Sequence, residues 1–261
     1  MTPASAADVR TVVHDGAVTG TRGLTEMYWT SEGIAAVAVD DAKDDLVQPE
    51  WTGDGSIART VGRLYASGTD GSPSACTATV VGVRTVVTAA HCVRTPVKGA
   101  PSSEATWDRN LYFVPGYRRG TSPNGGFTVR RIRMAENWQA DGLDVAMLEM
   151  NPGVDGRNIS EATGAQPISF TGEQGATTHF FGYPYTDRLV HCSGAGAWEA
   201  GKSMRSVPCM MGAGSSGGPY LAGEYAAGSV IAVNVSGGEG VSYGTALGAF
   251  AERLYQQSEH G

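Results

Sequence analysis

The feature that most limits how this chain can fold is a long series of short apolar runs separated by glycine and proline turns. From Thr60 onward, runs rich in valine, threonine and aromatic residues alternate with breaks such as Ser67-Gly68 and Asn151-Pro152-Gly153. Such runs between turn residues are typical of antiparallel strands. Because glycine is abundant, at 37 of 261 residues, and no helical repeat dominates, the sequence predicts an all-β fold.

The predicted strands form two sets, on either side of a polar stretch from Asn151 to Gln166 that we interpret as a linker. The first set comprises residues 61–67, 76–81, 85–90, 111–114, 127–132 and 145–150, and the second 167–170, 177–182, 189–193, 204–208, 219–221 and 230–235. Leu247, Phe250 and Leu254 then fall at helical spacing, so we expect a C-terminal helix over residues 245–257. Two sets of strands followed by a helix predict two antiparallel β-barrels.

The chain has four cysteines, Cys76, Cys92, Cys192 and Cys209, which allow three disulfide pairings. Their spacing favours two local bridges, Cys76–Cys92 and Cys192–Cys209, each worth about 3 kcal/mol by loop entropy. If residues 76–81 and 85–90 form a hairpin, Cys76 and Cys92 can face each other near its open end. Four free thiols in a cytosolic protein are the alternative, and the lack of a Cys-x-x-Cys pair disfavours a zinc site.

Charge and hydropathy bear on the class of partner. The net charge of -7 argues against a nucleic-acid partner, and no apolar stretch of 18 residues is present to span a membrane. We interpret one local basic cluster as a solvated strand face; it consists of Arg118, Arg119, Arg130, Arg131 and Arg133. The first residues lack the apolar region of a signal peptide, and we expect a secreted chain that is already trimmed.

Two short segments, far apart in the chain, carry residues for nucleophilic catalysis. Residues 88–92, Thr-Ala-Ala-His-Cys, place His91 at the end of an apolar strand. Residues 214–219, Gly-Ser-Ser-Gly-Gly-Pro, place a serine among glycines, where backbone N–H groups can surround its hydroxyl. A general base, a nucleophile and a set of donors for an oxyanion are the three parts that acyl transfer by serine needs.

Together with residues 144–148, Asp-Val-Ala-Met-Leu, these two segments resemble the three signature segments of chymotrypsin-fold serine proteases, in the order His, Asp, Ser. The resemblance covers roughly residues 59 to 257 and is closer to secreted bacterial members, including the glutamyl-endopeptidase branch, than to animal trypsins. It implies two antiparallel six-stranded Greek-key β-barrels with a C-terminal helix.

The resemblance also implies a role for each signature residue. His91 would act as general base, Asp144 would orient it, and Ser216 would be the nucleophile. The N–H groups of Gly214 and Ser216 would form the oxyanion hole. Asp141 is the nearest rival of Asp144, which we prefer because an apolar strand follows it, whereas Asp141 precedes a glycine that suits a turn.

Ser215 is the rival of Ser216, but Ser216 directly precedes the Gly-Gly-Pro of the motif. Animal members of the family usually carry an aspartate where this chain has Ser215, and that aspartate pairs with a newly cut N-terminal amine. Serine cannot form this ion pair. We therefore predict that activation does not depend on a buried N-terminal amine.

Two segments are expected to form the pocket for the residue before the scissile bond. The predicted substrate-binding residues are Met210, Met211, Ser236, Gly237 and Gly238. No aspartate stands before the serine to bind arginine or lysine, and no histidine stands near Val235 as in glutamate-specific relatives. The methionines favour an apolar, adaptable pocket, the alternative being that both belong to the core.

We expect three parts in the chain. Residues 1–56 form an N-terminal extension or pro-segment remnant, with a strand at 34–39 and an acidic turn after it. Residues 57–150 form the first barrel, carrying His91 and Asp144, and residues 151–261 form the second barrel with Ser216 and the C-terminal helix.

The predicted function is that of a secreted, monomeric serine endopeptidase without trypsin-like specificity, acting on protein or peptide substrates through an acyl-enzyme. We expect no cofactor and no metal, and a proteinaceous inhibitor is a further expected partner. Two alternatives share the fold: a hydrolase of non-peptide esters or amides, and an inactive binding homologue, which usually loses one of His, Asp or Ser.

Overall fold

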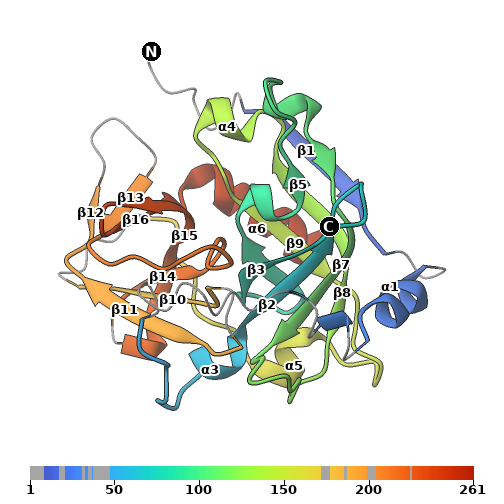
Figure 1. The fold of residues 1–261 in the computed structure, drawn as a ribbon, viewed down its shortest axis with the longest axis horizontal. Coiled ribbons are helices and arrows are strands. Elements are labelled where there is room, and N and C mark those ends of the chain that lie inside the picture. The colour runs from blue at the N-terminus through green and yellow to red at the C-terminus, as the bar shows by residue number, and fades with distance from the viewer. Residues whose placement is uncertain are drawn as a thin grey trace.

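The computed structural model describes residues 9–17, 21–30, 33–34, 37, 48–171, 177–184, 187–198, 204–223 and 225–261. Two strand-rich halves lie side by side, the earlier half of the chain in blue to green and the later half in orange to red (Figure 1). The predicted all-β fold is confirmed. Within the described ranges, no helix has the length and apolar character needed to cross a membrane.

The first half is a closed barrel. Its sheet has the order β1-β8-β7-β2-β3-β4-β9, and β8 also pairs with β9, which returns the sheet to itself. The strands are β1 (Thr11–Asp15), β2 (Val61–Ser67), β3 (Pro73–Val80), β4 (Thr85–Thr88), β7 (Arg109–Pro115), β8 (Phe127–Ala135) and β9 (Ala146–Met150). Six strands therefore close the barrel, and β1 extends the sheet from β8.

Short elements surround this barrel. They are α1 (Arg22–Tyr28), α3 (Ile57–Thr60), α4 (Trp138–Asp141) and a two-stranded ribbon of β5 (Arg94–Thr95) and β6 (Thr106–Trp107). The predicted linker 151–166 contains a further helix, α5 (Ile159–Thr163), whose first turn is stabilised by a capping box between Asn158 and Glu161. The linker is thus partly ordered by its own local hydrogen bonds.

The second half is a curled sheet with the order β11-β10-β14-β15-β16-β13-β12. The strands are β10 (Thr178–Gly182), β11 (Val190–Gly194), β12 (Ala197–Trp198), β13 (Met204–Val207), β14 (Pro219–Ala222), β15 (Ser229–Gly238) and β16 (Val241–Ala246). Among the described residues no strand pairing joins β11 to β12. The Cys192–Cys209 disulfide instead links β11 to the segment after β13.

The C-terminal helix is confirmed, but its predicted start is wrong. Residues 241–246 form β16, and the helix α6 begins only at Ala249 and ends at His260. Thr245 pairs with Met204 of β13 and with Val233 of β15, so partners distant in sequence override the local helical spacing. The prediction missed β1 and β16, and residues 167–170 form only one bridge, between Ile168 and Val230. Most of the predicted strand 34–39 lies outside the described residues.

Helix α6 follows the second sheet but packs against the first barrel. Phe250 and Leu254 are buried in the same core as Leu148 of β9. The Glu259 carboxylate accepts hydrogen bonds from the N–H groups of Val83, at 2.9 Å, and Arg84. The helix therefore fastens the end of the chain to the hairpin that leads into β4.

The predicted solvated face of basic residues is wrong for Arg133. Arg133 is buried and lies 3.3 Å from the carboxylate of the fully buried Glu149, which Arg130 also approaches at 3.3 Å. A buried carboxylate needs such pairing to remain charged. Arg119 pairs with Glu50 and Arg131 with Asp15, so the cluster neutralises acidic partners instead of forming a single open face.

Candidate active site

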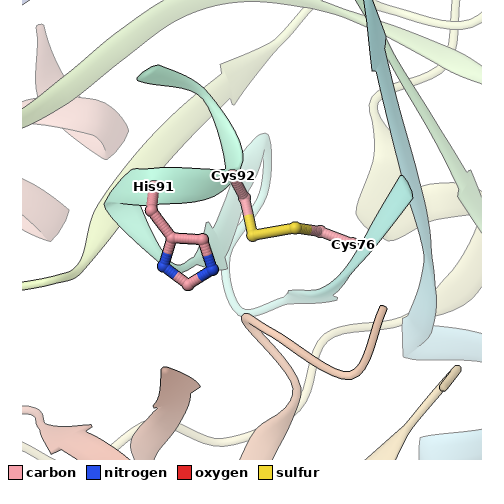
Figure 2. Close-up of side chains that lie close together, drawn as sticks. All are labelled: Cys76, His91 and Cys92. Atoms are coloured by element: carbon pink, nitrogen blue, oxygen red, sulfur yellow. A yellow bond between two sulfur atoms is a disulfide. The ribbon is translucent and has the colours of Figure 1, made fainter. Parts of the chain in front are cut away.

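His91 lies in a short 3-10 turn, Ala90–Cys92, directly after the buried strand β4. The predicted disulfide between Cys76 and Cys92 is present and ties this turn to β3. Figure 2 shows the His91 imidazole and the disulfide leaving the same turn, with the sulfur bridge running to Cys76. The second predicted disulfide, between Cys192 and Cys209, is also present.

The ligand-type atoms of Cys76, His91 and Cys92 lie within 4.8 Å of one another. Metal binding by cysteine requires the thiolate, and here both sulfurs are bonded to each other. The cluster is therefore a consequence of the disulfide beside the histidine, and it does not provide a thiolate site for a metal.

Asp144 contacts His91 through both carboxylate oxygens. Oδ2 lies 2.8 Å from Nδ1 of the ring, and Oδ1 accepts a hydrogen bond of 3.0 Å from the His91 backbone N–H. This arrangement fixes the ring orientation and leaves Nε2 available for proton transfer. Asp141, the rival residue, is exposed at the end of α4 and is followed by Gly142 at φ 66°, as a turn requires.

The loop that carries Ser216 passes against the end of β4, close to His91 along the chain. A Cβ on Gly217 would lie 2.1 Å from Thr88 Oγ1 and 3.0 Å from the backbone nitrogen of Ala89. Gly217 also has φ +79°, so both space and backbone conformation require glycine. The two sequence motifs therefore meet at the junction of the barrel and the second sheet.

Two N–H groups in the Ser216 loop are available for an oxyanion. The N–H groups of Ser215, Gly217 and Gly218 donate to carbonyls of Gly212, Asn234 and Ser215, respectively. Within the described part of the chain, the N–H groups of Gly214 and Ser216 donate to no protein acceptor. These are the two donors that the sequence predicts for the oxyanion hole.

Thr77 holds this loop from the first barrel. Its Oγ1 donates to the carbonyl of Gly214 at 2.9 Å, and its N–H donates to the carbonyl of Ser216 at 2.8 Å. The same Oγ1 accepts the Tyr183 N–H at 2.9 Å. Thr77 directly follows Cys76 in the chain. Two neighbouring residues of β3 therefore hold the site: Cys76 through the disulfide beside His91, and Thr77 through the carbonyls of the Ser216 loop.

Asn234 holds the loop from the second sheet. Its carbonyl accepts the Gly217 N–H at 2.7 Å, and its side-chain amide donates to Ser215 Oγ at 3.3 Å. Ser215 Oγ in turn donates to the Gly212 carbonyl at 2.7 Å, and Tyr220 donates to Asn234 Oδ1 at 3.0 Å. Ser215 is thus engaged in a neutral, buried network, whereas no hydrogen bond among the described residues involves the Ser216 hydroxyl.

The two predicted pocket methionines differ in position. Met211 is buried and packs in the core with Phe180 and Val207, as in the alternative that the sequence left open for both methionines. Met210 is half-buried, and its Cγ would lie 3.4 Å from a Cβ on Gly237. The structure therefore brings the predicted segments around Met210 and Ser236 to Gly238 together.

Sequence reasoning missed Thr77, Asn234, Tyr220 and Gln48, which hold the site without belonging to a motif. Their hydrogen bonds join residues far apart in the chain, such as Thr77 to Gly214 and Gln48 to Met210. In the sequence, the only indication that these residues lie near the site was their position in the chain: Thr77 follows Cys76, and Asn234 stands two residues before Ser236.

Two further histidines, His179 of β10 and His191 of β11, lie next to each other in the second sheet. His179 Nδ1 and His191 Nε2 are 3.1 Å apart, and the two rings stack with their centroids 5.3 Å apart. The Tyr225 ring packs against both histidines, and the Trp51 ring packs against His191. Burial and the neighbouring His179 lower the pKa of His191 to about 4, and burial also lowers the pKa of His179. Both rings are therefore neutral near pH 7 and act as packing surfaces.

Comparisons with known proteins identify the family of this chain and solved structures of similar fold. The family model described as Trypsin matches residues 54–252. The fold is similar to the thermostable serine protease AL20 from an extremophilic microorganism, at TM-score 0.70 and 26% identity over 78% of this chain and 99% of that one. It is similar to the protease Anisep from Arthrobacter nicotinovorans, at TM-score 0.69 and 25% identity over 79% and 98% of the two chains.

A third structure, a Glu endopeptidase in complex with MPD, shares the fold at TM-score 0.65 and 17% identity, over 84% of this chain and 99% of that one. No sequence among the curated proteins matches the chain.

Proposed function

Because this chain belongs to the trypsin family and is a serine endopeptidase, we propose that it cleaves peptide bonds through an acyl-enzyme formed on Ser216. The observation that carries the proposal is the double contact of Asp144 with His91, on the ring and on the backbone. It leaves Nε2 of His91 free of Asp144, and Gly217 of the Ser216 loop lies against Thr88 and Ala89, which precede His91 in the chain.

The reaction follows from this arrangement. Nε2 of His91 takes the proton of the Ser216 hydroxyl as its oxygen attacks the peptide carbonyl, and Asp144 stabilises the imidazolium. The imidazolium then gives the proton to the leaving amine as the C–N bond breaks. Water attacks the ester in the same way, which releases the acid and restores Ser216.

The N–H groups of Gly214 and Ser216 are the donors for the oxyanion in each tetrahedral intermediate. Thr77 binds the carbonyls of the same two residues, which fixes the peptide planes that directly follow the two donors in the chain. Donors that are already oriented cost no reorganisation during the reaction, and losing one typically costs about 10²–10³ in rate.

For specificity, we propose an apolar residue before the scissile bond. Met210 lies beside Gly237, and the residues before Ser216 include no carboxylate to bind arginine or lysine. The structure of a Glu endopeptidase is similar in fold alone, and this chain has no histidine near Val235. A peptide-library profile tests this specificity, and dominant cleavage after Arg, Lys or Glu would contradict it.

We further propose that the protein is secreted, because two disulfides persist best in an oxidising compartment. Its partners would be protein or peptide substrates and a proteinaceous inhibitor, and it would act as a monomer. The boundaries 1–56, 57–150 and 151–261 remain our proposed division of the chain.

Labelling with a phosphonofluoridate, read by mass spectrometry, tests the nucleophile. We expect one adduct on Ser216 and none in Ser216→Ala, and in Ser215→Ala the adduct should still form on Ser216. Turnover of casein separates a peptidase from an esterase on the same fold. Labelling without casein turnover would support the non-peptide alternative, and no labelling would support the inactive binding homologue.

A further inference from the structure

Residues 48–51, which we call the strap, lie along the free edge of the second sheet. The Trp51 N–H donates to the Leu189 carbonyl at 2.7 Å, and the His191 N–H donates to the Pro49 carbonyl at 3.1 Å. Glu50 forms a bridge with Val190 of β11. The strap therefore extends the sheet beyond β11, on the side where the described residues leave it open.

The strap also reaches the first barrel. Oε2 of Glu50 lies 2.8 Å from Arg119, and Oε1 lies 3.8 Å from Arg118. Trp51 packs edge-on against Phe181, with ring centroids 5.2 Å apart. The strap is thus held by both halves of the molecule, through charges on one side and through main-chain and aromatic contacts on the other.

Gln48 connects the strap to the loop before Ser216. Its side-chain amide donates a hydrogen bond of 3.0 Å to the carbonyl of Met210. Met210 contacts the Gly237 position on the opposite wall of the pocket. The strap is therefore one hydrogen bond away from the predicted base of the pocket.

An open space beside the loop that contains Met210 gives the Gln48–Met210 hydrogen bond a larger part in holding that loop. A cavity of about 710 Å³ lies beside it, lined among others by Gln48, His191, Cys209, Met210 and Gly240. Side chains do not fill this space, so packing does not support the loop from that side. Met210 lies between the disulfide-bonded Cys209 and the buried Met211, and Gln48 supplies a hydrogen bond to Met210 itself.

We propose that Gln48 is a positioning residue for the specificity pocket: its hydrogen bond to Met210 sets the base of that pocket. The proposal rests on the proposed function, because it assumes that Met210 faces the substrate. It assigns to the strap, which precedes the match to the family model at residue 54, a part in substrate choice that is distinct from the chemistry at Ser216.

The test compares Gln48→Met, which keeps the length but removes the donor, with Gln48→Lys, which keeps a donor. Gln256→Met on the exposed side of α6 is the matched control. The substrates are one peptide series in which the residue before the scissile bond ranges from alanine to phenylalanine. The rate of phosphonofluoridate labelling at Ser216 is measured in parallel, because this small reagent reports the triad without the pocket.

We expect Gln48→Met to lower kcat/KM about three- to tenfold more for phenylalanine than for alanine, mainly through KM, as loss of one anchoring hydrogen bond allows. The labelling rate should stay at the wild-type value, and Gln48→Lys should restore the preference. An unchanged phenylalanine-to-alanine ratio in Gln48→Met, or an equal loss on every substrate and on labelling, would overturn the proposal.

If Gln48→Met does not fold, the phenylalanine-to-alanine ratio of kcat/KM is measured in Glu50→Gln instead. It weakens the strap at the first barrel without touching the Met210 contact, and we expect a smaller shift of the same ratio. An unchanged ratio in folded Glu50→Gln would then overturn the proposal. Failure of the wild-type protein to label at Ser216 would contradict the proposed function instead.

Discussion

The two halves of this molecule hold their functional residues in different ways. The first barrel is closed by the pairing of β8 with β9, and its His91–Asp144 pair lies just beyond the adjoining ends of the paired strands β4 and β9. The second sheet, as far as the structure describes it, is not closed by strand pairing; the Cys192–Cys209 disulfide links β11 to the segment after β13, and residues 48–51 extend the edge at β11. The proposed general base, His91, is thus held at the end of a closed sheet, whereas the loop of the proposed nucleophile, Ser216, depends on separate anchors.

This difference is instructive because each half carries part of one site. The anchors of the loop are Thr77 from the first barrel, Asn234 from the second sheet and Gln48 from the strap. A loop held by several separate hydrogen bonds can be altered one contact at a time, so we expect mutations of these anchors to change activity without unfolding the protein.

The largest expected effect is in the closed half. Replacing Asp144 with asparagine should lower kcat about 10⁴-fold, because the wrong imidazole tautomer is stabilised. Asp141→Asn should leave kcat within about twofold, because Asp141 is exposed and accepts no hydrogen bond from His91. Steady-state kinetics on a peptide substrate measures both, and equal losses would refute the role of Asp144.

Removal of each disulfide compares the two halves directly. The two bridges span 16 and 17 residues, so each double Cys→Ser variant should lose about 3 kcal/mol of unfolding free energy in urea. We expect hydrogen exchange to rise along β11 without Cys192–Cys209. The amides of β3 should stay protected without Cys76–Cys92, because β3 pairs with β2 and β4. Equal deprotection of both strands would contradict the contrast.

A smaller effect is expected from the neutral network beneath the loop. Asn234→Leu removes the amide bonded to Ser215 and should lower kcat about 10- to 100-fold, because the oxyanion donors are less well held. Tyr220→Phe, which removes only the hydroxyl bonded to Asn234, should cost less than about threefold. Loss expressed in KM alone would argue against a role in transition-state stabilisation.

The smallest expected effect concerns pH. The pKa of His191 is about 4 in the folded state, below its ordinary value of 6.5, and that of His179 is also lowered by burial. The unfolded chain therefore binds more protons between these values, so stability falls as pH decreases from about 6.5 to about 4.

We expect Tm to fall by a few degrees over this range, and His191→Phe should reduce the fall. The groups that face His191 are His179, Trp51, Phe181 and Tyr225, which include no acidic partner to offset its charge. His260→Asn is the control, because that residue is exposed at the end of α6. An equal fall of Tm in His191→Phe and the wild type would exclude this histidine as the cause.

Much of the fold was predictable because it depends on local sequence. Strands such as β2 and β9 are short apolar runs between turn residues, and helix α6 has apolar residues at helical spacing. Strands β1 and β16 were missed because their residues form no apolar run, and their partners lie far away in the chain. The placement of Met211 in the core and Met210 at the pocket depends on packing in the same way.

By itself, the sequence determined the candidate catalytic residues: His91, Asp144 and Ser216 stand in motifs whose residues are neighbours in the chain, and the cysteine spacing led to the correct disulfides. Only the tertiary structure decided how the oxyanion loop is held, through Thr77, Asn234 and Gln48. The physical reason is that a motif is local along the chain, whereas a hydrogen bond between distant segments exists only once the two halves have folded together.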